Sequence, residues 1–508
     1  MRQRPTLGDL RRRLRGVVRR RVRIETRSLA AFRIALGLLL LADLLSRSRS
    51  LRAFYTDGGV LPRTALLAQH DSLHWSIHLA VGETWGQALL FAVAGLFAVA
   101  LTVGYRTRLA AAVSWLLLVS LHNRTPDVLN GGDILLRLLL FWGLFLPLGA
   151  RWAVDAHHRA DDGDVSTAGS ESVASAASAA LLVQVVALYL TNAAFKLGGD
   201  VWVRGDGLRY VFSLGQFTVL LGDHLGQFPL LLHALDYVWL ATISLSFALL
   251  LLTGWRRGVY ACLLMGMHLG MLVTMRIDLF PLISVASLLP FLPETFWCRL
   301  AQLVDGRTVR AADRCHRRLA DVLPAVRVAD VPPALSRVQT RLSSAVVVVF
   351  LVLVVLWNVQ YLGAAQVVGH EPVPEEAEPT LQVTGTDQYW NMFAPDPLST
   401  DGWVVAPAEL PDGTRVDAYR GGSVNWTRPA DVSATYPTAR WRKYLVGLWR
   451  YDTADRRHFA AYLCDRYERR HGVRPERVSV YFVEQPTVVG VPDADEPTDR
   501  TRLVRHHC

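Results

Sequence analysis

The sequence has few cysteines, and they lack the spacing of a metal site or a disulfide framework. Five occur among 508 residues, with no CxxC pair and no regular interval between them. Structural zinc sites and disulfide scaffolds both depend on such spacing. HExxH, GxGxxG, GxSxG and P-loop patterns are missing as well. The sequence therefore indicates neither a metal nor a nucleotide cofactor.

Lysine is the second scarce residue. Of the 54 Lys and Arg residues, only Lys196 and Lys443 are lysines. Arginine supplies positive charge but stays protonated, whereas lysine can lose its proton. Lys196 ends an apolar run and precedes a Gly-Gly-Asp turn in the stretch YLTNAAFKLGGDVWVRGDG. An ionisable group at membrane depth favours a chemical role. The alternative is a lysine that snorkels from a helix end.

Long hydrophobic runs are abundant. Hydrophobic residues make up 51% of the chain, and the mean hydropathy is +0.24. They cluster in blocks whose lengths suit a hydrocarbon core of about 30 Å. The net charge of +10 comes mostly from arginines between these blocks, where they act as topology signals and do not indicate a nucleic-acid partner. The expected spans are residues 28–46, 85–103, 109–121, 130–149, 180–195, 229–252, 259–274, 279–292 and 343–362.

These blocks predict an all-α polytopic membrane helical bundle of about nine spans, with a small α+β extracytoplasmic C-terminal domain. The bilayer is the expected partner, and the location is the cell membrane. With a cytoplasmic N-terminus, the arginine-rich loops fall on the cytoplasmic side. Lys196, Asp57 and Asn130 then share the outer face with the C-terminal domain. Residues 212–228 predict a re-entrant or interfacial helix.

The chain divides into segments by composition. A turn between two strand-like runs and two amphipathic helices predict the α+β domain at the C-terminus, and the aromatic segment 389–395 is expected to dock on the bilayer surface or on the bundle. The segments are 1–27, a basic cytoplasmic surface helix; 28–154, the first transmembrane half; 155–179, a flexible linker; 180–298, the second half; 299–341, a basic cytoplasmic segment; 342–363, the last span; and 371–508, the extracytoplasmic domain.

Polar residues at the block ends are candidates for a pocket beside Lys196. Asp133 and Arg137 lie one helical turn apart, which fits an internal ion pair or one wall of a polar pocket. His268 stands alone in an apolar block, which is more typical of packing than of a ligand. The full set of pocket candidates is Arg33, Asp57, Asn130, Asp133, Arg137, Asp200, Trp202 and His268.

Three histidines follow one another at helical spacing. His70, His74 and His78 would share one face of a helix, and histidines at i and i+4 can bind one metal ion. Asp71 is the one nearby carboxylate, so the pattern favours the polar face of an interfacial helix over a metal site.

The motifs FYTDGGVLPR, LNGGDILLRLLLFWGLFLPLG and AAFKLGGDVWVRG resemble the horizontally transferred transmembrane (HTTM) family, which is similar to vitamin K-dependent γ-carboxylase. The resemblance covers roughly residues 28–300. It implies that Lys196 is the base that deprotonates a reduced quinone, vitamin K or menaquinol, and that a protein or peptide on the outer face is the substrate. Two departures bear on the substrate: Asn130-Gly131-Gly132-Asp133 replaces a stretch with a histidine, and a short tail replaces a large peptide-binding region.

Three functions fit these residues. A quinol-dependent carboxylase or epoxidase requires a pocket beside Lys196 in which no carboxylate contacts the lysine amine. A non-enzymatic immunity, scaffold or export-assisting protein would instead pair Lys196 with Asp200, Asp206 or Asp133. A transporter would use Arg33, Asp133 and Arg137 as a polar path across the bilayer.

Overall fold

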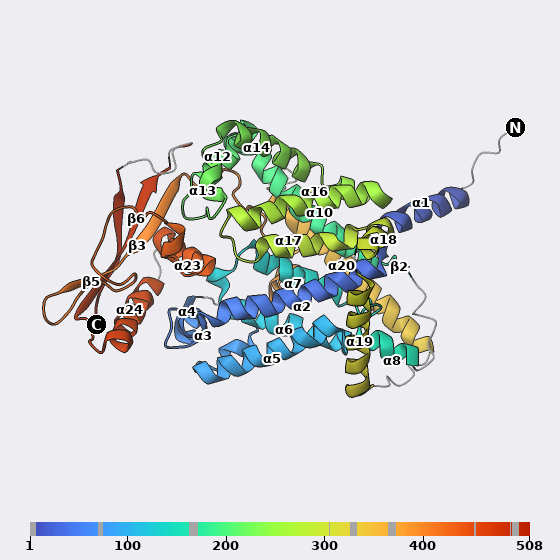
Figure 1. Ribbon diagram of the computed structural model, residues 1–508, viewed down its shortest axis with the longest axis horizontal. Helices are drawn as coiled ribbons and strands as arrows, with labels where there is room; N and C mark the ends of the chain where they lie inside the picture. Colours follow the sequence, from blue (N-terminus) through green and yellow to red (C-terminus); the bar gives the residue numbers. More distant parts are fainter. Residues whose placement is uncertain are drawn as a thin grey trace.

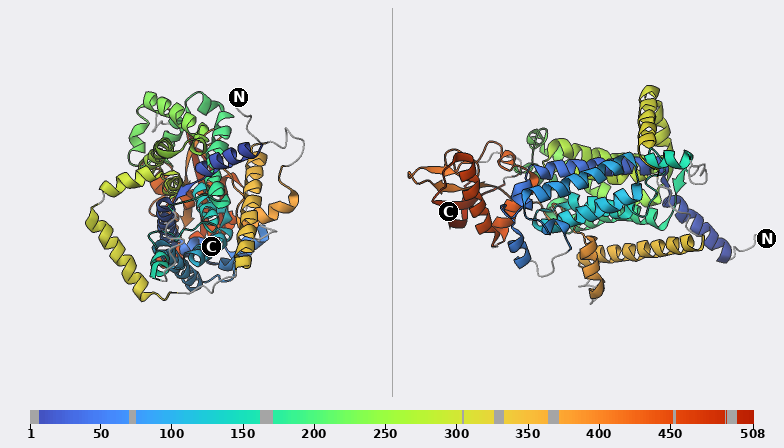
Figure 2. Two further views of the ribbon diagram at one scale, coloured as in Figure 1. Left: turned by 90° about the vertical axis from the view of Figure 1, so that its right-hand side faces the viewer. Right: turned by 90° about the horizontal axis from the view of Figure 1, so that it is seen from below.

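The computed structural model describes residues 7–69, 75–161, 171–303, 305–325, 333–363, 372–451, 454–487, 489 and 497–508. Long helices lie side by side and form a bundle, with a small sheet domain at one end (Figures 1 and 2). The N-terminal helix α1 (Leu7–Arg21), α8 (Val154–Asp161) and α19 (Gly306–Val322) lie at the opposite end. The tight helix contacts include α2 with α5, and α10 with α20.

Among the described residues, five helices are long and apolar enough to cross a membrane. A sixth is possible if the pair at Phe280–Phe291 and Glu294–Leu303, bent by 112°, counts as one broken span. The chain is therefore a membrane protein with a helical bundle, as the sequence predicts. The five helices are α2 (Thr26–Ser48), α5 (Thr84–Val103), α10 (Ala176–Leu197), α16 (Gly254–Thr274) and the 337–361 part of α20 (Pro333–Tyr361).

The predicted count of nine spans is not confirmed, although each predicted block contains helix. The third block becomes α6 (Thr107–Arg124), which ends in three polar residues, and the fourth becomes α7 (Gly131–Gly143), which has 13 residues. The sixth block breaks into α14 (Pro229–Ser244) and α15 (Ala248–Leu251). The eighth folds as α17 (Phe280–Leu288), followed by a short 3-10 turn and α18 (Glu294–Leu303). Apolar composition alone does not reveal these breaks.

The predicted linker 155–179 is partly structured. Its beginning belongs to α8, and Ser172–Val173 (β2) pairs with Ile24–Glu25 (β1) in an antiparallel ladder. α8 packs against α19, within the basic segment 299–341. Residues 212–228 contain no long helix: α12 (Gly207–Phe212) and α13 (Gly222–Leu225) are short.

The C-terminal domain is α+β, as predicted. Its strands form an antiparallel sheet in the order β3-β6-β4-β5, with β7 also paired to β6. The turn predicted between the two strand-like runs lies at residues 411–414 and joins β4 to β5. The Asp412 carboxylate there accepts a hydrogen bond from the Thr414 amide. The elements are β3 (Thr400–Val405), β4 (Pro407–Glu409), β5 (Arg415–Asp417), α23 (Ala439–Arg450), α24 (Asp455–His471), β6 (Arg477–Pro486) and β7 (Asp499–His507).

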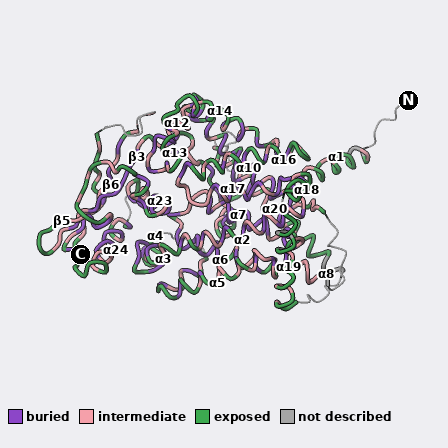
Figure 3. Tube along the Cα trace, in the orientation of Figure 1, coloured by how far each residue is buried: buried purple, intermediate pink, exposed green. Residues whose placement is uncertain are grey.

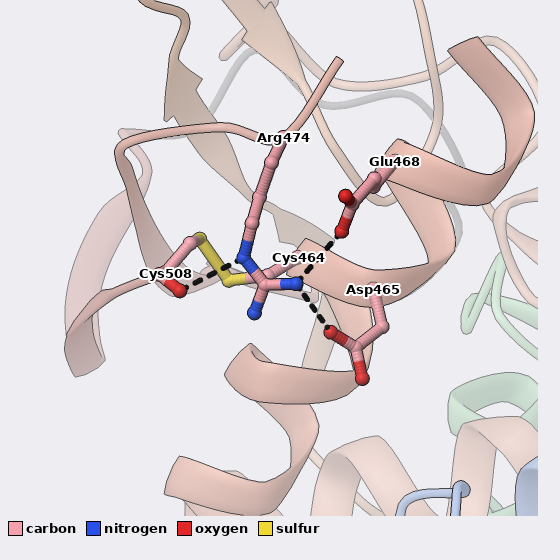
Figure 4. The surroundings of a disulfide bond; sticks show 5 residues. All are labelled: Cys464, Asp465, Glu468, Arg474 and Cys508. Carbon is pink, nitrogen blue, oxygen red and sulfur yellow. Dashed lines mark hydrogen bonds and ion pairs between the residues drawn. A yellow bond between two sulfur atoms is a disulfide. The ribbon is translucent and has the colours of Figure 1, made fainter. Parts of the chain in front are cut away.

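A disulfide between Cys464 and Cys508 ties α24 to the end of the chain after β7 (Figure 4). The spacing of the cysteines gives no sign of it, because the two partners are 44 positions apart and are brought together by the packing of α24 against β7. Arg474 lies over the bond: its guanidinium donates to the Cys508 carbonyl and to the carboxylates of Asp465 and Glu468.

The C-terminal domain and the bundle share a hydrophobic core. Phe54 and Tyr55, from the short helix α3 (Leu51–Tyr55), are buried with Trp441 and Tyr444 of α23. The rings of Phe54 and Trp441 are 4.7 Å apart. Burial continues from the bundle into α23 (Figure 3). The domain is therefore packed onto the end of the bundle, which positions the site described next.

Candidate functional site

A cavity of about 810 Å³ lies between the bundle and the C-terminal domain. α10, α12, α16 and α17 contribute to its bundle side, and residues 387–398 and α23 to its C-terminal side. Four residues predicted from the sequence line it: Lys196, Trp202, Asn130 and Arg137.

Lys196 lies in the last turn of α10. The side chain is 2% exposed. Its amine donates hydrogen bonds to the main-chain oxygens of Met392 (3.1 Å) and Phe393 (3.2 Å). The ring of Trp202 lies 3.3 Å from the nitrogen, and its indole N–H donates to the Phe393 oxygen at 2.7 Å. Two carbonyls and one aromatic face therefore surround the amine.

A second residue of α10 holds the same C-terminal segment. Asn192, one turn before Lys196, donates its amide N–H groups to the oxygens of Trp390 (2.7 Å) and Met392 (3.2 Å). We call residues 390–393 the strap. It passes over the end of α10 and presents Met392 and Phe393 to the cavity. The sequence carries one signal for this contact that the predicted pocket residues did not include: Asn192 is a polar residue inside an apolar run, four positions before Lys196.

Further along the same helix, Gln184 donates to the Gln388 side chain at 2.6 Å and accepts a hydrogen bond from Trp142. Trp357 of α20 donates to the Gln388 main-chain oxygen at 2.9 Å. These contacts fix the chain immediately before the strap. The predicted docking of the aromatic segment 389–395 thus takes place on the bundle.

In the described part of the chain, no carboxylate forms an ion pair with Lys196. Of the acids considered for that pairing, Asp206 pairs with Arg209 (2.7 Å), and Asp200 is exposed at the start of α11 (Asp200–Val203). Asp236, of α14, interacts electrostatically with Lys196, but its oxygens accept the amides of residues 207 and 208. The amine is held by neutral groups.

Asp133, the third of those acids, belongs to a buried ion network behind the cavity. One of its oxygens is 2.5 Å from the guanidinium of Arg47 and 2.7 Å from that of Arg440. Asp43 pairs with the same two arginines, each at 2.7 Å. Arg440 comes from α23, so the network joins the C-terminal domain to α2 and α7.

The network also contains a set of possible metal ligands. The ligand atoms of Asp43, His122 and Asp133 lie within 4.8 Å of one another. Both carboxylates, however, are already neutralised by Arg47 and Arg440. A divalent cation would have to displace two guanidinium groups, so this set does not fit a metal centre.

Residues 22–297 match the family model of the HTTM domain. This match covers more than half of the 508 residues. The chain belongs to the HTTM domain family. The likeness to vitamin K-dependent γ-carboxylase that the sequence predicts is a property of this family. No curated protein and no solved structure matches the chain.

Two of the remaining candidates in the HTTM domain lie in or beside the cavity. Asn130 caps α7: its side-chain oxygen accepts the amides of Gly132 and Asp133. Arg137 pairs with Asp387 at 3.4 Å, not with Asp133 as one interpretation of their spacing had it. Arg137 is 5% exposed, and its Nε has no hydrogen-bond partner among the described residues.

The other candidates lie elsewhere in the HTTM domain. Arg33 donates to the main-chain oxygens of residues 102, 148, 151 and 152. Asp57 forms a 2.7 Å ion pair with Arg63, and the hydrogen bond from Arg63 lowers the pKa of the Asp57 carboxyl. His268 is buried and contacts the Tyr189 hydroxyl at 2.9 Å. Arg33, Asp133 and Arg137 thus have separate partners and do not form one polar path.

The three-histidine pattern is only partly within the described structure. His70 and His74 lie outside the described residues. His78 is buried, and its Nδ1 lies 2.7 Å from the Ser120 hydroxyl. His78 is therefore a packed residue with a hydrogen-bond partner.

The family match ends at residue 297, but the cavity does not. The strap and α23 lie beyond it and supply one side of the cavity. The candidate site is thus composite: the HTTM domain provides Lys196 and Trp202, and the C-terminal domain provides the groups that hold Lys196.

Proposed function

We propose that this HTTM-domain protein is a quinol-dependent membrane enzyme of the carboxylase or epoxidase type, in which Lys196 acts as the base. The observation that carries this proposal is the state of the Lys196 amine: it lines a large cavity and has no carboxylate partner among the described residues. A structural lysine in a bundle is expected to pair with an acid.

The surroundings suit proton transfer at Nζ. A neutral amine has two N–H groups and one lone pair, and the oxygens of Met392 and Phe393 accept both N–H groups. The lone pair is left to take a proton. The Trp202 ring then stabilises the charged amine through a cation–π contact.

The cavity suits a quinone ring with a hydrocarbon tail. Its volume of about 810 Å³ lies in the range of small-molecule sites. Phe217, Trp239, Phe280 and Phe393 supply aromatic surface. A reduced quinone would supply the electrons for reaction with dioxygen, which yields the quinone epoxide and water. The protein's residues would bind the ring, orient it and accept the hydroxyl proton at Nζ.

We further propose that the site faces the outside of the cell, where a protein or peptide substrate reaches it. The arginine-rich loops favour a cytoplasmic N-terminus. The Cys464–Cys508 disulfide supports an extracytoplasmic C-terminal domain, because disulfides persist in oxidising compartments.

The experiment is epoxide formation by purified protein in lipid, supplied with dioxygen and reduced vitamin K or menaquinol. The account predicts epoxide that accumulates in proportion to enzyme and requires the quinol. Absence of turnover with several quinols would favour the second candidate, a non-enzymatic membrane protein. One observation supports that candidate: the contacts of Lys196 and Asn192 also serve to fix the strap.

A further inference from the structure

The cavity carries more positive than negative charge. Among its described lining residues are two acids, Asp387 and Asp396. Asp387 pairs with Arg137, and Asp396 accepts the Val201 amide. The lining cations are Arg137, Lys196, Arg442, Lys443 and Arg450, of which the last three belong to α23.

Two of the α23 cations are held without a carboxylate. Arg442 donates to the main-chain oxygens of Gln216 (2.8 Å) and Arg276 (3.0 Å), and its guanidinium lies 3.9 Å from the centre of the Phe217 ring. Lys443 donates to the Leu129 oxygen and is accessible through the cavity that it lines. Neither forms an ion pair within the part of the chain that the structure describes.

Holding a buried guanidinium on neutral groups alone costs free energy. Burial lowers the pKa of Arg442 to about 10, even though the nearby acids Asp278 and Asp401 act in the opposite direction. A lowered pKa in a cation means that its charged form is disfavoured where it stands. An anion bound beside these groups would remove that penalty.

The opposite side of the cavity is apolar. It is formed largely by Leu208 and Val211 of α12, Met271 of α16, Met275 directly after α16, and Trp239 of α14. The cationic helix α23 lies at the end of the bundle, between the bundle and the sheet (Figure 1). Charge at the end of the bundle and apolar surface along its helices match a lipid, whose headgroup lies at the interface and whose chains extend into the hydrocarbon.

We propose that the cavity binds an anionic phospholipid, with its phosphate group beside Arg442, Lys443 and Arg450 and an acyl chain against α12 and α16. A quinol carries no charge, so one held beside Lys196 and Trp202 would leave the cations of α23 uncompensated. An acidic peptide would neutralise them but would leave the apolar side unfilled. Lipid binding does not depend on the proposed quinol chemistry and would hold equally in a non-enzymatic protein.

The test is native mass spectrometry of the full-length protein in detergent, titrated with phosphatidylglycerol or with phosphatidylcholine of the same chains. The variant is Lys443→Gln combined with Arg450→Gln. Arg442 is left in place because it bridges two segments of the bundle. The matched control is Arg457→Gln, an exposed arginine of α24.

We expect saturable phosphatidylglycerol binding that is at least tenfold tighter than that of phosphatidylcholine. The double variant should weaken it about 30-fold, the effect of two cations near a lipid surface, while Arg457→Gln leaves it unchanged. Equal binding of both lipids would overturn the proposal. An affinity for phosphatidylglycerol that is the same in the double variant and in wild type would also overturn it. Binding of a glutamate-rich peptide that requires Lys443 and Arg450, without phosphatidylglycerol binding, would overturn it in favour of a peptide site.

Discussion

At the scale of single residues, the rarity of lysine in the sequence singles out Lys196. The sequence could not show what holds the amine, because Met392 and Phe393 are almost 200 positions away. Main-chain oxygens also leave no signature in the sequence. The same reason hid the pairing of Asp133, whose partners Arg47 and Arg440 come from distant helices. The spacing of one helical turn suggested Arg137 as the ion-pair partner of Asp133 instead.

Asn192 is the residue whose role is easiest to isolate. Asn192→Ala removes two hydrogen bonds to the strap. The variant leaves buried acceptors without a donor, which costs about 1–3 kcal/mol of local stability. Amide hydrogen exchange in residues 389–396 should therefore be at least tenfold faster. Thr191→Ala is the matched control, because Thr191 donates to Asn358 and not to the strap. Equal exchange in the two variants would mean that Asn192 does not hold the strap.

At the scale of elements, the hydrophobic blocks predicted the positions of the helices better than they predicted the number of helices that span the membrane. Every block became helical, but Pro229 to Leu252 broke between α14 and α15, and the block before Leu292 ends in a sharp bend. Hydropathy measures transfer to lipid and carries no information on tertiary bends. The packing of α23 on the bundle could not be predicted from the sequence either, since one of its contacts is a network of charges drawn from α2, α7 and α23.

That network predicts a large cost for removing its C-terminal member. Arg440→Met would leave Asp43 and Asp133 buried with one guanidinium between them. Breaking a buried ion pair from one side costs about 3–5 kcal/mol. Chemical unfolding in detergent should show this loss, whereas Arg457→Met on the surface should change stability by less than about 0.5 kcal/mol. A similarly small change in the free energy of unfolding of both variants would show that the network does not stabilise the contact between the two domains.

At the scale of the whole molecule, the family and the membrane class follow from the sequence, and the composite cavity does not. The residues that close the cavity lie outside the matched HTTM domain. The orientation in the membrane is a prediction, and the cysteines provide a test. Cys508 lies in the C-terminal domain, while the exposed Cys298 and Cys315 lie at the opposite end of the bundle, in α18 and α19.

In intact cells treated with a mild reductant, a membrane-impermeant maleimide should label Cys508. Cys298 and Cys315 should react only after lysis. A Cys508→Ser variant identifies the labelled site. Labelling of Cys315 in intact cells, with Cys508 protected, would place the C-terminal domain in the cytoplasm and reverse the proposed orientation.

The central claim is that Lys196 acts as a base and not only as a charge. The most direct measurement compares quinol epoxidation by wild type, Lys196→Arg and Arg457→Lys, which exchanges the same two residue types at an exposed position of α24. Arginine keeps the charge but cannot accept a proton near neutral pH. The account predicts at least a 100-fold loss in Lys196→Arg, as expected for removal of a general base, and little change in Arg457→Lys. Epoxidation that persists in a folded Lys196→Arg protein would contradict it.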